Sequence, residues 1–163
     1  WNINTTGGNS QAIGIDDVSV TPTFSGVTVN GTIAANEYGV HTNGSNQQSS
    51  ATGTWYMSSD ATNLYIGISG ANTAEGAVLY LDRNPITPVN GGTNTDGNLV
   101  GYNYDGSSFA NLQFRADLVV YFKDGYQEYR TANGTGGWSA ATTTGMTYAS
   151  TAGTAGTREI AIP

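Results

Sequence analysis

Two stretches near the middle of the chain alternate between apolar side chains and polar or small ones. Leucine and isoleucine occupy every second position of residues 64–69, and alanine and leucine do so in residues 77–82. A period of two places alternate side chains on one face of a β-strand. Because a polar, Gly/Asn-containing break at residues 70–76 separates the runs, the pattern predicts two adjacent antiparallel strands with their aliphatic side chains in a core.

The same alternation predicts further strands along the chain, at residues 12–20, 55–58, 99–104, 117–123, 126–131 and 158–162. Lys123–Gly125 has the composition of a hairpin turn. Residues 32–38 and 41–53 are predicted as connections without a strand, and residues 83–97 as a long loop of the kind that often carries function. No segment shows a helical period. The sequence therefore predicts an all-β fold, an antiparallel two-sheet β-sandwich of the jelly-roll type.

The best internal boundary is Thr21-Pro22-Thr23, a short extended linker. It divides the chain into an N-terminal strand and linker, residues 1–24, and a β-sandwich domain, residues 25–163. About twenty residues cannot bury a core of their own. The leading strand is therefore expected to be the tail of a preceding domain or a strand exchanged with a neighbour.

The composition excludes several classes of function. Five Lys and Arg against twelve Asp and Glu give a net charge of −7, so no basic surface for nucleic acid can form. The absence of cysteine excludes disulfides, thiol catalysis and zinc–thiolate sites. No apolar run approaches the roughly 20 residues that span a membrane. Few lysines with many Thr, Asn and Gly favour an extracellular or cell-surface protein, and an acidic surface is compatible with a divalent cation or a neutral sugar.

Catalysis is not expected. His41 is the only histidine and lies in a polar segment without an evident partner. A glycosidase needs two carboxylates that flank one bond, and no motif marks such a pair among the twelve acids. Asp60 and Asp124 are interpreted as turn formers.

Calcium is the better chemical hypothesis, because hard cations bind several carboxylate, amide and carbonyl oxygens on a loop that can wrap them. Oxygen donors occur at alternate positions of 94–98 and flank the long loop on both sides. The candidate ligands are Asp82, Asn84, Asn94, Asp96, Asn98 and Asp105. A turn of the same composition without an ion is the alternative interpretation, and Asp16-Asp17 is a second candidate position.

Sugar binding would use exposed flat aromatic rings beside planar polar groups. The candidates are Trp138, Trp55, Tyr102, Tyr104, Tyr126 and Tyr129. Trp55 lies on a predicted strand beside apolar positions, which favours a core role, whereas Trp138 follows two glycines and is expected to be more exposed. Tyr126 and Glu128 share one face of their strand and Tyr129 the other, so one of the two tyrosines is expected to face solvent.

Three short motifs resemble the signatures of family 9 carbohydrate-binding modules and the related DOMON-like sandwiches. The first is Val29-Asn30-Gly31 with Glu37-Tyr38, the second is Trp55-Tyr56-Met57 followed by residues 60–68, and the third is residues 78–82, an apolar strand that ends on Asp. The resemblance covers residues 25–163. It implies a two-sheet antiparallel sandwich, often with bound calcium and in some members with a sugar held between aromatic rings. It also implies at least one further strand beyond Pro163.

Residues 12–21 resemble the final strand of a laminin-G-like or MAM-like jelly roll. An additional strand in front of the domain and a missing strand behind it suggest strand exchange through residues 12–20, because an open sheet edge binds a partner strand. The first functional hypothesis is a non-catalytic extracellular module that binds glycans or acts as an adhesin. The second is a structural subunit of an extracellular filament or surface assembly joined by strand exchange, and an enzyme is the least favoured.

Overall fold

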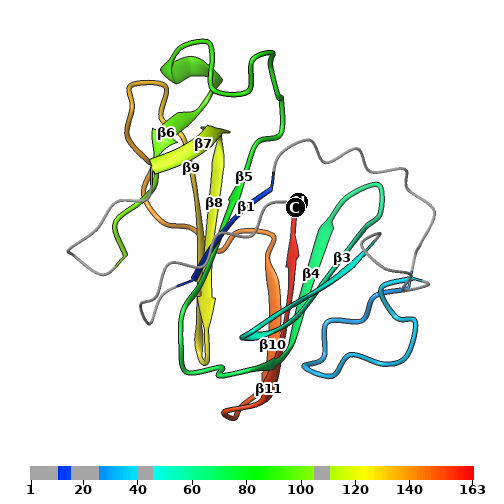
Figure 1. Ribbon diagram of the computed structural model, residues 1–163. Helices are drawn as coiled ribbons and strands as arrows, with labels where there is room; N and C mark the ends of the chain where they lie inside the picture. Colours follow the sequence, from blue (N-terminus) through cyan, green and yellow to red (C-terminus); the bar gives the residue numbers. More distant parts are fainter. Residues whose placement is uncertain (1–10, 16–25, 40–45, 105–110) are drawn as a thin grey trace. The chain divides into compact units, whose positions relative to one another are not determined.

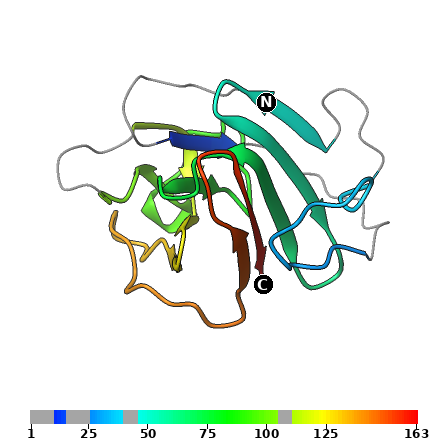
Figure 2. The same cartoon turned by 90° about the horizontal axis from the view of Figure 1, so that it is seen from below.

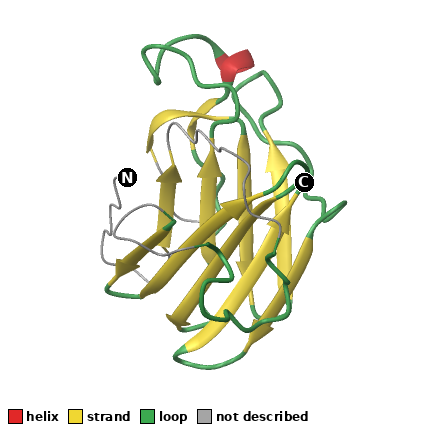
Figure 3. Cartoon of the chain, turned by 90° about the vertical axis from the view of Figure 1, so that its right-hand side faces the viewer, coloured by secondary structure: helices red, strands yellow, loops and turns green. Residues whose placement is uncertain are grey.

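The computed structural model describes residues 26–39, 46–104 and 111–163, together with the backbone of residues 11–15 (Figure 1). Strands dominate it, and a three-residue 3-10 turn, η1 (Asn94–Asp96), is the single helical element in these residues (Figure 3). This confirms the prediction of an all-β, sandwich-like fold built from antiparallel sheets. The chain divides into two compact units, each assembled from separate segments.

The first unit comprises the described parts of Trp1–Ser19, Gly76–Phe122 and Tyr126–Thr143. Its four-stranded sheet has the order β1 (Gln11–Ile15), β5 (Ala77–Leu81), β8 (Leu118–Lys123) and β9 (Tyr126–Thr131), and a two-stranded sheet joins β6 (Asn98–Val100) to β7 (Asn111–Ala116). Strand β1 runs parallel to β5, whereas β5 and β8 run antiparallel.

The second unit comprises the described parts of Val20–Glu75, Lys123–Gly125 and Thr144–Pro163. Its sheet has the order β10 (Thr147–Thr151), β11 (Gly156–Ile162), β4 (Leu64–Ala71), β3 (Gly53–Ser59) and β2 (Gln47–Ser50), and all its pairings are antiparallel (Figures 1 and 2). The β3–β4 hairpin turns at Asp60, whose carboxylate accepts the N–H groups of Thr62 and Asn63 at 2.7 and 2.8 Å. Asp60 is thus a turn former, as predicted.

The predicted pairing of the two central runs is wrong. Strand β4 lies in the five-stranded sheet and β5 in the four-stranded sheet, so they are not neighbours. Residues 70–76, which connect β4 to β5, are held in place and do not form a tight turn. Thr73 is fully buried, and its hydroxyl donates to the Asp124 carboxylate at 2.6 Å. The alternation itself was informative, because Ile66, Ile68 and Leu79 are all buried, although Leu64 is only half-buried.

Three strands lie where no strand was predicted: β7, in a stretch that the pattern left unassigned, and the two edge strands β2 and β10. Strand β2 falls within the expected connection at 41–53, and β10 follows a segment without a clear pattern. Both are polar, are at most half-buried, and lie at the two edges of their sheet, where alternation is not required. Strand β6 is shorter than predicted and ends at Val100, whereas the β8–β9 hairpin forms as predicted.

A buried carboxylate fixes the connection at residues 26–39 in the second unit. Glu159 of β11 is fully buried, and one of its oxygens accepts the N–H groups of Asn30, Gly31 and Thr32 at 3.0, 2.8 and 3.1 Å. Its other oxygen accepts the Tyr38 hydroxyl at 3.0 Å. Burial raises the pKa of that hydroxyl, and the adjacent Glu159 carboxylate adds to the effect, so Tyr38 remains a donor.

Glu37 has a similar role beside it. Its two oxygens accept the N–H groups of Thr28 and Ala34 at 2.9 and 2.7 Å. The Glu37-Tyr38 pair of the first motif therefore organises this connection by hydrogen bonding to backbone and to β11.

We predict that Glu159→Gln lowers the free energy of unfolding by about 2 kcal/mol, because hydrogen bonds to a buried charged acceptor contribute about 1.5–3 kcal/mol. Urea unfolding measures the change. Glu75→Gln is the matched control, since Glu75 is exposed, and it should shift stability by less than about 0.5 kcal/mol. Equal stabilities of the two variants would contradict a clamping role for Glu159.

Candidate functional site

One face of the four-stranded sheet carries a cluster of aromatic side chains. Val78 and Tyr80 of β5 lie opposite Tyr121 and Val119 of β8 on this face. Residues of β7, of the loop after β6 and of the segment after β9 pack over them. We call the group the aromatic face and define it by Tyr80, Tyr102, Tyr104, Tyr121, Tyr126 and Trp138.

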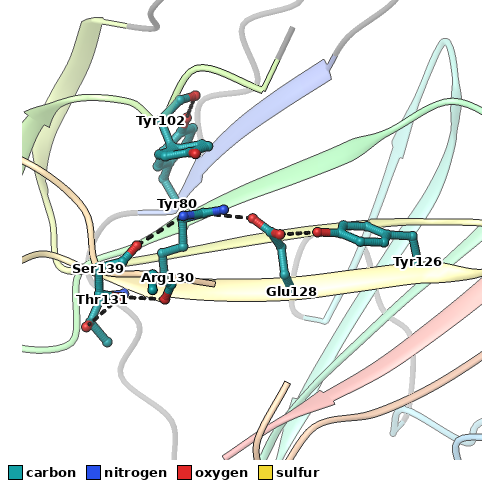
Figure 4. A network of polar contacts seen from close by, with 8 residues as sticks. Tyr80, Tyr102, Tyr126, Glu128, Arg130, Thr131 and Ser139 are labelled. Atoms are coloured by element: carbon teal, nitrogen blue, oxygen red, sulfur yellow. Dashed lines mark hydrogen bonds and ion pairs between the residues drawn. The ribbon is translucent and has the colours of Figure 1, made fainter. Parts of the chain in front are cut away.

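Strand β9 adds an ion pair to the aromatic face. Tyr126, Glu128 and Arg130 occupy alternate positions and therefore project on the same side of the strand (Figure 4). The Glu128 side chain is only 4% exposed, and one of its oxygens accepts the Arg130 Nε–H at 2.7 Å. Its other oxygen accepts the Tyr126 hydroxyl. The carboxylate is thereby held between a cation and a phenol.

Arg130 is fixed on several sides. Its guanidinium lies over the Tyr102 ring, 4.0 Å from the ring centre, a cation–π contact. Its Nη1 donates to the Ser139 carbonyl at 3.1 Å, and the Ser139 hydroxyl in turn accepts the Thr131 N–H at 3.0 Å (Figure 4). These contacts hold the cation in one orientation and engage much of its donor capacity.

The tyrosine rings stack in sequence across the face. Tyr104 lies parallel to Tyr121 with ring centres 4.5 Å apart, and Tyr102 meets Tyr104 edge-on at 4.8 Å. Tyr126 meets Tyr121 edge-on at 5.9 Å. Burial raises the pKa of the Tyr104 hydroxyl, and the charge of Glu128 raises it further. Within this row, Tyr126 presents the most open ring, with 45% of its surface exposed.

Trp138 packs against another part of the aromatic face, beside Tyr80. Its indole N–H donates to the Val100 carbonyl at 3.1 Å, and its ring lies 6.1 Å from the Tyr80 ring centre. The Tyr80 hydroxyl donates to the Tyr102 carbonyl at 3.3 Å (Figure 4). Trp138 is half-buried and secured at its polar edge, so it is less open than its position after two glycines suggested.

Four of the six predicted sugar-binding residues meet in the aromatic face: Tyr102, Tyr104, Tyr126 and Trp138. The other two do not. Trp55 is 7% exposed on β3 of the second unit, in agreement with the core interpretation. Tyr129 alternates with Glu128 and Arg130 on β9, and its backbone bridges to Thr142.

Sequence reasoning missed Arg130 as a site residue and did not assign Glu128 to the site. The alternation of Tyr126, Glu128 and Arg130 was a usable signal, because it places a ring, an acid and a base side by side on one strand face.

The five candidate calcium ligands within the described residues are not gathered into one acidic group. The Asp82 carboxylate accepts the Asn84 N–H at 3.1 Å, and Asp96 accepts the Thr93 N–H at 2.8 Å to cap η1. Asn98 donates to the Gly137 carbonyl at 2.8 Å, while its buried side-chain oxygen has no hydrogen-bond donor among the described residues. Asp105 lies outside the described residues, as do Asp16-Asp17 and His41. No three His, Cys, Asp or Glu side chains in the described residues lie together as a metal site.

A guanidinium occupies the oxygen-rich loop where calcium was predicted. Arg115 of β7 is 9% exposed and donates to the carbonyls of Gly92 at 3.2 Å and Gly97 at 2.8 Å, and to that of Gly91. Its Nη1 also lies 3.4 Å from the side-chain oxygen of Asn94. The loop thus wraps a cation supplied by the chain itself, and calcium binding stays a prediction.

Comparison of the chain with protein-family models, with curated proteins and with solved structures found no match. The resemblance to family 9 carbohydrate-binding modules therefore rests on the three motifs alone. No helix in the described part of the chain has the length and hydrophobicity needed to cross a membrane.

We predict that Arg115→Lys destabilises the protein by about 2–3 kcal/mol, since an ammonium cannot reproduce the planar fork from which three loop carbonyls accept hydrogen bonds. Arg83→Lys is the matched control: Arg83 pairs with Asp117 at 2.7 Å, but its side chain is 56% exposed. Solvent-exposed ion pairs contribute at most about 1 kcal/mol to the free energy of unfolding. Urea unfolding of both variants should separate them, and a stable Arg115→Lys protein would show that the loop does not depend on the guanidinium.

The buried tyrosines predict sensitivity to alkaline pH. Burial raises the pKa of Tyr80 to about 12 from an ordinary value of 10.0. The protonated phenol is therefore favoured by the folded state, so its stabilisation is complete below about pH 10 and is lost as the pH rises from about 10 to 12. In an absorbance titration at 295 nm, exposed tyrosines should ionise first and Tyr80 only with cooperative unfolding, as seen by circular dichroism. Ionisation of all ten tyrosines near pH 10 with native dichroism would contradict this.

Proposed function

We propose that this chain is a non-catalytic, extracellular β-sandwich module of a larger secreted surface protein, and that it binds glycans at the aromatic face. The observation that carries the proposal is the open Tyr126 ring beside the ion pair of the buried Glu128 and the half-buried Arg130. Sugars bind proteins by stacking apolar C–H surfaces on rings and by hydrogen bonding their hydroxyls to fixed planar polar groups. Both kinds of group lie together here.

The electrostatics favour a neutral glycan. Arg130 is the single cation in the cluster, and it is neutralised by Glu128 and stacked on Tyr102. An anionic sugar would have to compete with Glu128 for the guanidinium and would approach a chain of net charge −7. A neutral sugar makes no such demand, because it can stack on the Tyr126 ring without separating the Glu128–Arg130 ion pair.

The rigidity of the cluster supports binding of modest strength. Stacked rings and a fixed ion pair leave little side-chain entropy to lose on binding. One open ring with a few hydrogen bonds would contribute about 4–5.5 kcal/mol, which corresponds to a dissociation constant of about 1 mM to 0.1 mM. We therefore expect a weak module whose avidity comes from several copies.

The test is a glycan array followed by calorimetric titration of the neutral sugars that bind. Tyr126→Ala should weaken binding at least tenfold because it removes the stacking surface. Tyr126→Phe keeps the ring but loses the hydrogen bond to Glu128, so its binding should fall only a few-fold. Tyr129→Phe is the control on the other side of β9 and should bind normally. A folded protein that binds no neutral glycan, or a Tyr126→Ala variant with unchanged affinity, would overturn the proposal.

A second candidate role is that of a structural subunit in an extracellular filament or surface assembly, joined by exchange of an N-terminal strand. Residues 11–15 pair with β5 of their own chain at the edge of the sheet, which favours the module role, and the assembly role requires a strand of another copy to fill the same position. The two roles are compatible, because the aromatic face and the β1 edge use different residues.

A further inference from the structure

Asparagine followed by glycine is the pair in which a side-chain amide reacts most readily with the backbone, because glycine has no side chain to block the approach. The chain contains four such pairs, and three of them lie in the described residues: Asn30-Gly31, Asn90-Gly91 and Asn133-Gly134. All three asparagines are exposed, so water reaches each of them. The hydrogen bonds around them, however, differ from pair to pair.

The glycine nitrogen is the group that attacks, and in two of the three pairs it is already engaged. The Gly31 N–H donates to the buried Glu159 carboxylate at 2.8 Å, and the Gly91 N–H donates to the Pro88 carbonyl at 2.7 Å. The Gly134 N–H has no hydrogen-bond acceptor among the described residues. Its nitrogen can therefore lose a proton to solvent and attack without first breaking a hydrogen bond within the protein.

The side-chain amide of Asn133 is polarised at its oxygen. Its Oδ1 accepts the Thr135 N–H at 2.9 Å, the Thr135 hydroxyl at 2.8 Å and the Gly137 N–H at 3.0 Å. Attack on the adjacent carbon places negative charge on this oxygen, and donors that already point at it stabilise that charge. In the described residues, the Asn30 side-chain oxygen accepts a single N–H, that of Thr32.

We propose that Asn133-Gly134 is a site of spontaneous backbone modification, at which the asparagine is converted to aspartate or isoaspartate. The Gly134 nitrogen gives its proton to solvent hydroxide and forms a bond to the side-chain carbon of Asn133. The bond from that carbon to Nδ2 breaks, and ammonia leaves with a proton taken from water. One water molecule then opens the succinimide ring at either carbonyl. The net reaction consumes one water and releases one ammonia, and it needs no enzyme, oxidant or reductant.

The modification changes a loop that leads to the aromatic face. Either product adds a negative charge, and isoaspartate also adds one methylene to the main chain. The Asn133 N–H donates to the Gly137 carbonyl at 2.9 Å, and the same carbonyl accepts the Asn98 side-chain amide at 2.8 Å. Because Gly137 directly precedes Trp138, a longer main chain at Asn133 alters the path of the chain just before that ring.

Ageing of the folded protein in mildly alkaline buffer, followed by tryptic peptide mapping with mass spectrometry, tests the proposal. Trypsin releases residues 131–158, in which Asn133 carries the single side-chain amide, so a mass gain and new chromatographic peaks of this peptide report the reaction directly. In the folded protein Asn133 should react at least about tenfold faster than Asn30 and Asn90, because their glycine N–H groups must first give up a hydrogen bond. The chain unfolded in guanidinium chloride is the matched control, in which the three pairs should react at similar rates.

Two variants test the donors to Oδ1. Thr135→Val removes the hydroxyl and should slow the reaction of Asn133 several-fold, whereas Thr135→Ser keeps a hydroxyl and should react as the natural chain does. Equal rates at the three asparagines of the folded protein, or a Thr135→Val protein that reacts as fast as Thr135→Ser, would overturn the proposal. If circular dichroism shows that Thr135→Val does not fold, the comparison of the folded and unfolded natural chain decides. Glycan binding is not measured, so failure here leaves the proposed function unaffected.

Discussion

The four-stranded sheet depends on a strand that has no solvent-facing side. Alternation normally lets one face of an antiparallel strand be polar. In β5 the side chains of both faces are buried. Val78 and Tyr80 face the aromatic cluster, and Leu79, which lies between them in the sequence, is fully buried. The chain must therefore cover one face with rings from the segments around β6 and β9, and must complete the free edge with β1. The aromatic face and the pairing of β1 with β5 both follow from this one requirement.

Charged residues are few in this chain, and several of them are buried where glycine-rich segments need support. Glu159 accepts the N–H groups of residues 30–32, and Arg115 donates to the carbonyls of Gly91, Gly92 and Gly97. Such loops contain few apolar side chains, so burial alone would not order them against their conformational entropy. A carboxylate that accepts several N–H groups, and a guanidinium that donates to several carbonyls, can fix the backbone as a disulfide or a bound metal does in small domains that have one.

The sequence predicted which segments form strands better than it predicted their partners. Alternation at 64–69 and 77–82 depends on burial, which is local, whereas pairing depends on the path of the chain; β4 and β5 therefore proved to belong to different sheets. Strands β2 and β10 are edge strands without an apolar face, so periodicity could not reveal them. The side shared by Tyr126 and Glu128 was predictable from a period of two. The position of Arg115 was not, since its partners are backbone carbonyls, which every residue has.

The aromatic face and the β5 edge reinforce each other if both proposals hold. A single site built on one open ring is weak, because the buried ion pair that makes it rigid also limits how many polar groups can reach a ligand. Linking copies through β1 would set many such sites at fixed spacing, and an effective concentration in the millimolar range would convert weak contacts into avid ones. Exchange uses an edge of the sheet and leaves the Tyr126 ring open, so assembly would multiply the binding sites without consuming them. If copies were linked and the face bound sugars as proposed, such a sheet would suit a surface layer that adheres through many weak contacts.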